Sequence, residues 1–572
     1  MVRVIVAMAM AAGLAQSVVA VMDMGDEHVC TTVGSTPKCW GANNWGQLGR
    51  EDNTTNVGDD PDELGDNLVG VAVGGIVSEM ALGGEHTCML LDSGDVVCFG
   101  HNDKGQLGLG DTVNRGQTVG SVGETVSFGT DLTAVAITSG CEHTCGLLDD
   151  GSVKCFGYNN FGQLGQGTTD DMGDDDGEMG DDLTTVPLSG TVAGIAAGCD
   201  FTCALMEDGS VMCWGRNNWG QLGTGDSDDR LDGSNLELVA VDLNGSVAVE
   251  IAAGEGHTCA RLEDASIKCW GHNNVGQLGQ GDDVDRGDSA VNLGVALAAV
   301  SLGTGDVPTG VDCGSSHTCV LLDDGSVKCF GANDDGQLGT GTTDSVGTLP
   351  TEMGDNLVAV AFSDPVSDVA AGGSSTCAVS SDDSVTCWGR GNNGQLGQGN
   401  DEDIRTVVDV APVDVGSDVL SLTPAPSATL PVTPIPSSPP TAAPSTSTAS
   451  VDPSAAPTSL TTFLSTSTTP SPSTTQPVAS SVAPTAPTTA SSFAPSAAPT
   501  AASRQAGFTS GPTVTPVTLA PLGPGETHSP TPAPSDLVDV DTEGSGAPAH
   551  FNAGLLATVT LGAAGFMGAL FL

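Results

Sequence analysis

The chain has 572 residues, of which 71 are acidic and 15 basic, and its formal net charge at pH 7 is −56. A chain this negative repels phosphate backbones and has no cluster of Lys or Arg to release counterions, which argues against nucleic acid as a partner. Aromatic residues make up only 3% of the chain and cysteines number 17, so we expect thin sheets packed with Val, Leu, Ala and Gly.

Residues 1–20 have the pattern of a secretory signal peptide. Arg3 supplies a short positive region, Val4 to Leu14 an apolar region, and Val18-Val19-Ala20 a cleavage site. We therefore expect the mature chain to begin at Val21 and its cysteines to form disulfides in an oxidising compartment.

An eleven-residue motif, CWGANNWGQLG at Cys39, recurs along the chain with a mean spacing of 58 residues. The later copies start at Cys98, Cys155, Cys213, Cys269, Cys329 and Cys387. A regular period of this kind indicates a repeat architecture. In each repeat two apolar runs flank a turn sequence ahead of the motif, as in HTCGLLDDGSVKCFG, which predicts a β-hairpin.

The hairpin geometry places paired cysteines opposite each other. With a three-residue turn at Asp149, Asp150 and Gly151, Cys145 faces Cys155 at a non-hydrogen-bonded site, where Cα atoms lie about 4.5 Å apart and a disulfide can form. The predicted disulfides are Cys30–Cys39, Cys88–Cys98, Cys145–Cys155, Cys203–Cys213, Cys259–Cys269, Cys319–Cys329 and Cys377–Cys387. The first has a shorter, two-residue turn at Gly34-Ser35. Ala265 and Asp383 replace the turn glycine, so we expect strain or a different turn there.

The pattern GxxHTC…DGSVxCWGxNxxGQLG resembles the regulator of chromosome condensation repeat, in the cysteine-paired form found on exported chains. The resemblance covers about residues 24–422 and implies an all-β, seven-bladed β-propeller, with the repeat domain at 21–422. The best-known family member binds chromatin and exchanges nucleotide on a small nuclear GTPase. Exported relatives, beta-lactamase inhibitor protein II among them, grip a partner protein with the propeller loops.

Ring closure is expected from the C-terminal end of the repeats. The first hairpin, at His28, lacks the preceding strand that the other hairpins have. We expect Asp418 to Leu422 to supply that strand and so remove the free sheet edge.

Three cysteines remain outside the hairpins: Cys141, Cys199 and Cys313. Because the total is odd, at least one thiol is free or intermolecular. A zinc site of Cys141, His143 and Cys145 is conceivable, but His86, His257 and His317 recur at the same place, which favours a structural role for the histidine. We therefore assign no metal ligands.

Acidic loops separate the repeats, the densest being residues 167–183, with eight acids among seventeen residues. Such loops could bind calcium, but the spacing is not that of a helix-loop-helix site and solvated loops are the commoner case. No cofactor is assigned, and calcium stays open. The related phrases at 61–68 and 351–357 predict a repeated loop conformation.

The tryptophans fall into two groups by their place in the motif. Trp40, Trp214, Trp270 and Trp388 are expected to pack between blades. Trp45 and Trp219 stand where other copies have Lys104, Val275 or Asp335. We expect these two to be exposed and take them as candidate ligand contacts. No nucleophile elbow or phosphate-binding loop is present, so no catalytic residues are assigned and the chain is expected not to be an enzyme.

Residues 423–540 are rich in Ser, Thr, Pro and Ala and cannot bury a core. In an exported chain this composition predicts an extended, O-glycosylated stalk; the alternative is an unmodified linker. Asn53 and Asn244 lie in sequons for N-glycosylation.

Residues 541–572 contain an apolar tail, 553–572, preceded by small residues. This arrangement predicts a glycosylphosphatidylinositol anchor attached at Gly544, the alternative being a transmembrane helix. The function expected is a cell-surface, membrane-anchored binding or adhesion scaffold for a protein or glycan. The alternative is guanine nucleotide exchange on a small GTPase, as in the nuclear and cytoplasmic branch of the family.

Overall fold

The structure is a computed structural model that describes residues 21–52, 55–231, 238–408 and 410–416. Contacts divide the chain into two units, Met1–Ser437 and Ser438–Leu572, and every described residue belongs to the first. The expected signal peptide, stalk and anchor, with Gly544, lie outside the described residues, as does Asn53. Within the described part of the chain, no helix is long and apolar enough to cross a bilayer.

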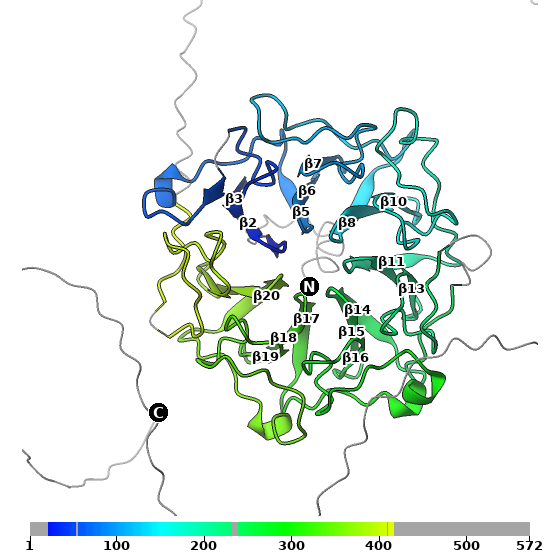
Figure 1. Ribbon diagram of the computed structural model, residues 1–572, viewed down its shortest axis with the longest axis vertical. Helices are drawn as coiled ribbons and strands as arrows, with labels where there is room; N and C mark the ends of the chain where they lie inside the picture. Colours follow the sequence, from blue (N-terminus) through cyan, green and yellow to red (C-terminus); the bar gives the residue numbers. More distant parts are fainter. Residues whose placement is uncertain (1–20, 53–54, 232–237, 409, 417–572) are drawn as a thin grey trace, which may run out of the picture. The chain divides into compact units, whose positions relative to one another are not determined.

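In the described residues, twenty-two strands form seven antiparallel sheets, which Figure 1 shows arranged radially as the blades of a propeller. Blade one has β1 (Met22–Met24), β2 (His28–Val33), β3 (Thr36–Ala42) and β4 (Asn56–Val57), and blade two has β5 (Val77–Leu82), β6 (His86–Leu91) and β7 (Val96–Gly100). Blade three has β8 (Ala134–Ser139), β9 (His143–Leu148) and β10 (Val153–Gly157), and blade four has β11 (Val192–Ala197), β12 (Phe201–Met206) and β13 (Val211–Gly215). Blade five has β14 (Ala248–Ala253), β15 (His257–Leu262) and β16 (Ile267–Gly271), blade six has β17 (Pro308–Cys313), β18 (His317–Leu322) and β19 (Val327–Gly331), and blade seven has β20 (Val366–Gly372), β21 (Ser375–Ser380) and β22 (Val385–Gly389). The seven-bladed all-β fold is thus confirmed.

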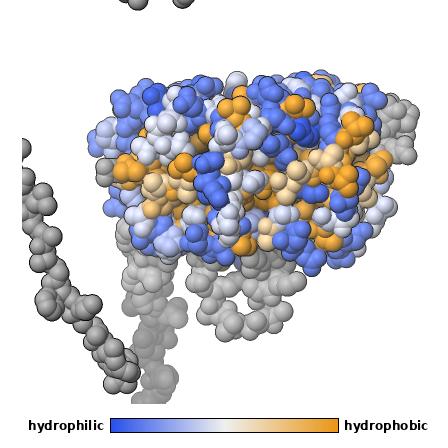
Figure 2. All heavy atoms as spheres, turned by 90° about the horizontal axis from the view of Figure 1, so that it is seen from below, coloured by the Kyte–Doolittle hydropathy of each residue, from blue (hydrophilic) through white to orange (hydrophobic). Residues whose placement is uncertain are grey.

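Within each blade the strands follow chain order from the inside outward, so that β1, β5, β8, β11, β14, β17 and β20 line a central cavity. Four short 3-10 helices lie in the connections: Gly65–Asn67, Ala290–Asn292, Gly294–Ala296 and Gly354–Asn356. Those at Gly65 and Gly354 have nearly identical cap dihedrals, which confirms the repeated loop conformation. On the side of the ring seen in Figure 2, hydrophobic residues gather at mid-height between more hydrophilic margins.

The hairpins form as their sequences predict. Leu148 donates its N–H to the Ser152 carbonyl at 2.8 Å, and Cys145 pairs with Cys155 in the register. All seven predicted hairpin disulfides are present, with Cα atoms 4.0–4.1 Å apart. Ala265 and Asp383 keep the same turn at φ of 61° and 67°, so the strain expected for non-glycine residues in the left-handed region falls on them.

The predicted source of the first inner strand is wrong. The inner position of blade one is occupied by β1, which pairs with β2 through Met24 opposite Val29 and Asp23 opposite Cys30. Residues 418–422 lie outside the described residues. The sequence pattern missed β1 because three residues directly after a predicted cleavage site are too short to show an alternating pattern.

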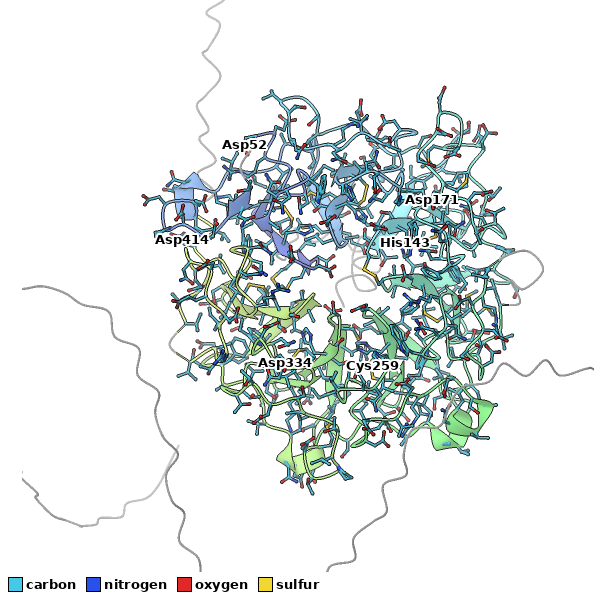
Figure 3. All side chains as sticks on the ribbon, in the orientation of Figure 1. Asp52, His143, Asp171, Cys259, Asp334 and Asp414 are labelled. Carbon is cyan, nitrogen blue, oxygen red and sulfur yellow. A yellow bond between two sulfur atoms is a disulfide. The ribbon has the colours of Figure 1, made fainter. Side chains whose placement is uncertain are left out.

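Blade seven closes the ring onto blade one through side chains and backbone far apart in sequence. Trp40 donates its indole N–H to the Gln395 carbonyl, and Gly65 donates its N–H to the carbonyl of Asp414, at the ring periphery in Figure 3. The same indole contact recurs between other blades, from Trp214 to Gln163, Trp270 to Gln221 and Trp388 to Gln337. All four indoles are fully buried, so their predicted packing between blades is confirmed.

A ring of glycines lets the inner ends of the blades approach one another. At Gly25, Gly83, Gly140, Gly198, Gly254 and Gly372, an added Cβ would lie 2.3–2.6 Å from the carbonyl oxygen of the corresponding glycine in the next blade. A real Cβ cannot approach so closely, so these positions require glycine where each inner strand turns into the middle strand.

Candidate functional site: the channel end and its aromatic rim

A buried histidine joins neighbouring blades at five of the seven junctions. His143 Nε2 lies 2.9 Å from Thr202 Oγ1, and Thr202 donates its hydroxyl to the Gln163 carbonyl (Figure 3 labels His143). The equivalent pairs are His28–Thr87, His86–Thr144, His257–Thr318 and His317–Thr376. This confirms the structural role inferred for the histidines.

The hydroxyl geometry fixes the tautomer of these rings. Because the threonine proton is committed to the glutamine carbonyl, the histidine must donate from Nε2, which leaves Nδ1 unprotonated and without a partner. Burial lowers the pKa of His143 to about 4 and that of His86 to about 3. The rings are therefore neutral at physiological pH.

The cysteines outside the hairpins are also placed. Cys141 and Cys199 form a disulfide that joins blades three and four, while Cys313 is free and buried. Both sulfurs of the conceivable zinc site are thus engaged, Cys141 with Cys199 and Cys145 with Cys155. They offer no thiolate to a metal.

Glu178 and Asp181 of the 167–183 loop accept hydrogen bonds from backbone N–H groups. Glu178 accepts N–H groups from Gly173 and Asp175, and Asp181 accepts the N–H of Thr130 at 2.6 Å. Glu63 and Glu352 accept from the corresponding turns of their own loops. The three glutamates thus have the same structural use in the three loops. Asn244 lies in a tight turn at φ 61°.

The central cavity has a volume of about 1160 Å³ and an acidic lining that includes Glu79, Asp368 and Asp312. Arg261 forms an ion pair of 2.6 Å with Glu250 on its wall. Burial raises the pKa of Asp312 to about 7, although its carboxylate accepts the N–H of Ala371 from blade seven. The cavity wall therefore carries acidic groups among the small apolar residues of the inner strands.

The two candidate contact tryptophans lie on the face where inner strands turn into middle strands. Each contacts a histidine of the next blade with ring centroids 4.4 Å apart: Trp219 stacks on His272, whereas the Trp45 ring is tilted by 32° against His101. Both indoles are half-buried, so the expectation of free exposure is wrong. Contact with the neighbouring blade covers one side of each ring.

Around Trp219 the contacts continue across three blades. The Arg216 guanidinium lies 4.8 Å from the Phe161 ring and 5.3 Å from the Trp219 ring, and it pairs with Asp200 at 2.9 Å. We call Phe161, Arg216, Trp219 and His272 the aromatic rim. Sequence reasoning missed Phe161, Arg216 and His272. Arg216 and His272 occupy the fourth motif position, which varies between repeats, and Phe161 occupies the same motif position as Trp219.

The repeated hairpins close into a ring of seven blades, and the loop residues described above gather on one face of that ring. These features define the chain as a β-propeller. The chain belongs to the RCC1-like domain family, whose model matches residues 36–424.

The relatives found by sequence match part of this chain. The ultraviolet-B receptor UVR8 of Arabidopsis thaliana is 28% identical over 303 residues, covering 53% of this chain and 62% of the receptor. The human E3 ubiquitin-protein ligase HERC2 is 28% identical over 376 residues, covering 63% of this chain and 7% of the ligase. The chain therefore spans less than two thirds of either relative.

Solved structures agree on the fold. Human WBSCR16 superposes with a TM-score of 0.52 at 20% identity, covering 65% of this chain and 92% of that one. Yeast RCC1, solved bound to Kap60, gives a TM-score of 0.52 at 19% identity, covering 70% and 89%.

Proposed function

We propose that the ring is a non-enzymatic module that binds a partner protein through the aromatic rim. The observation that carries this proposal is the continuous contact of Phe161, Arg216, Trp219 and His272 across blades three to five. Tyr, Trp and Arg side chains held rigid by their neighbours are the residues enriched at binding hot spots. A half-buried indole retains an open edge for a partner and loses little conformational entropy when it binds.

The comparisons support a protein as partner. Yeast RCC1 was solved in a complex with the protein Kap60, and its fold is the fold of this chain. A glycan is the alternative ligand, since tryptophan faces also stack on sugars. The rim favours protein because Arg216 and Asp200 add a charged pair beside the aromatic rings.

We further propose that the ring is displayed on the outer face of the plasma membrane. Eight disulfides support an oxidising compartment, because cytosolic thiols are kept reduced. Two sequence features support display at the cell surface: the predicted export signal at 1–20 and the predicted anchor signal around Gly544. The same disulfides disfavour the alternative of nucleotide exchange on a cytoplasmic or nuclear GTPase.

Crosslinking on intact cells tests the binding proposal. The wild-type chain and Trp219→Asn, which installs the residue found at this position in blade seven, would carry a photo-crosslinker at Asn218. We expect a specific crosslinked protein with the wild type and loss of at least nine tenths of it with the variant. Asn393→Ala, the equivalent change in blade seven, is the control and should leave the crosslink intact. Equal crosslinking by all three chains would contradict the proposal.

A further inference from the structure

A second cluster on the same face surrounds His101, at the junction between blades two and three. One ligand atom each of His101, Asp103 and Glu142 lies within 4.8 Å of the others. His101 and Asp103 follow β7 in blade two, whereas Glu142 precedes β9 in blade three. The cluster therefore spans a junction between blades.

Both nitrogens of His101 face carboxylates. Nδ1 lies 3.4 Å from Glu85 Oε2, and Nε2 lies 3.6 Å from Asp103 Oδ1. Ligands of a tetrahedral ion bound at about 2.0–2.2 Å are separated by about 3.4 Å, so Nε2 and Asp103 already stand near that spacing. A carboxylate behind the other nitrogen is the usual means of orienting a metal-binding imidazole. The Trp45 ring also packs against the imidazole, tilted by 32° with the centroids 4.4 Å apart.

Comparison with the equivalent histidine of blade five shows that the carboxylates around His101 are not a general feature of the repeat. His272 also contacts a tryptophan, but Gly256, Asn274 and Ser316 occupy the positions of Glu85, Asp103 and Glu142. Blade six has the acid Asp334 (Figure 3) but Ala332 in place of the histidine. Among the described blades, histidine and all three carboxylates coincide only around His101.

The local charge favours a dication. Glu85, Asp103 and Glu142 bring three negative charges, and the one nearby lysine, Lys104, lies 3.6 Å from Asp103. These like charges repel one another across the junction. A bound dication would relieve this repulsion.

We propose that His101, Asp103 and Glu142 form a binding site for a divalent metal ion of the zinc type, with Glu85 orienting the imidazole. One imidazole and two carboxylates suit such an ion. Because Asp103 is half-exposed, the fourth coordination position of the ion would be open to water or to a partner's side chain. The ion would tie blade two to blade three. The other group of potential ligands among the described residues, at His257, contains Cys259, which its disulfide with Cys269 removes.

The test is Zn²⁺ titration of the untagged, chelator-stripped full chain in competition with a chromophoric chelator. We expect one saturable site of higher affinity than the acidic surface provides. His101→Tyr, which installs the aromatic residue that blade three has as Tyr158, and Glu142→Gln should each weaken that site at least tenfold. Glu85→Gln should weaken it about tenfold through ring orientation. His272→Tyr is the matched control and should bind as the wild type does.

A gain of affinity provides the opposite test. Lys104→Val, which copies Val275 of blade five, removes the competing cation and should tighten Zn²⁺ binding by threefold or more. Each variant is first checked for wild-type thermal unfolding in chelator, so that lost binding cannot reflect lost folding. The proposal is overturned if the wild type has no such site, or if His101→Tyr and Glu142→Gln both bind Zn²⁺ like the wild type.

Discussion

The indole Nε1 of Trp40 donates a hydrogen bond of 2.9 Å to the backbone oxygen of Gln395, 355 residues along the chain, and this contact closes the ring. At this junction Val29 stands in the place of the threonine, and Ser375 in the place of the histidine, that pair between other blades. We therefore expect Trp40 to contribute more to the stability of its junction than the other three buried tryptophans contribute to theirs.

Trp40→Ala is expected to destabilise the ring more than Trp388→Ala. Each change removes a fully buried indole, at a cost of about 3–5 kcal/mol. At the Trp388 junction, however, His317 and Thr376 remain bonded at 2.9 Å. Thermal unfolding by circular dichroism should give the lower Tm for Trp40→Ala. The reverse order would show that the closing junction has other major support.

Disulfide mapping should find Cys141 linked to Cys199 and a single unpaired thiol at Cys313. Because Cys313 is buried and burial raises its pKa, an alkylating reagent should not label it in the native protein. Denaturation without reductant should expose one label per chain. Labelling of Cys141 or Cys199 under those conditions would refute the pairing.

Acid should unfold the ring steeply, through its buried histidines. Their pKa values are lowered by burial, for example to about 3 at His257 and about 4 at His317, so the folded state stays neutral while the unfolded state gains protons below pH 6.5. Stability is thus lost as pH falls from about 6.5 towards 4, by up to about 1.4 kcal/mol per pH unit for each histidine.

Two exchanges isolate this effect, because blade four already has Phe201 in the histidine position. His143→Phe should lower proton uptake on unfolding at pH 5 by about one per molecule, and Phe201→His should raise it by about one. Uptake follows from the pH dependence of urea unfolding. Unchanged uptake in both variants would contradict the neutral, buried state.

Ionisation of Asp312 should lower the stability of the ring as pH rises, whereas protonation of the histidines lowers it as pH falls. Its folded pKa of about 7 lies above the unfolded value near 3.8, so the folded state is penalised as pH rises from about 4 to 7 and the penalty stays constant above that. Asp312→Thr copies Thr138, which accepts the N–H of Ala197 at the same register in blade three. We expect a higher Tm than wild type at pH 8 and no gain at pH 4. A gain that is equal at both pH values would rule out ionisation as the cause.

Gly140→Ala should disrupt the ring of glycines. Its Cβ would lie 2.3 Å from the Gly198 oxygen, which forces blades three and four apart at a cost of about 1–3 kcal/mol. Gly194→Ala is the control, since the nearest atom to its added Cβ, on Leu205, is 4.0 Å away. Urea unfolding of the two variants should show a loss for Gly140→Ala alone.

The sequence by itself determined the repeat, the hairpins and their disulfides, because these depend on contacts a few residues apart. Turn length and strand pairing place Cys145 against Cys155 whatever the rest of the chain does. The seven copies of the motif gave the number of blades, and the resemblance to a known repeat family gave their arrangement as a propeller. The buried tryptophans followed from their constant place in the motif.

Only the tertiary structure decided which residues meet between blades. Cys141 reaches Cys199, Trp45 contacts His101, and Glu142 approaches Asp103 because ring geometry sets the offset between neighbouring repeats. The same geometry puts β1 in the inner position of blade one, a place that three residues of sequence do not reveal. Contacts across a junction join residues of different repeats, and their distances depend on how the blades pack. A pattern within one repeat contains no information about that packing.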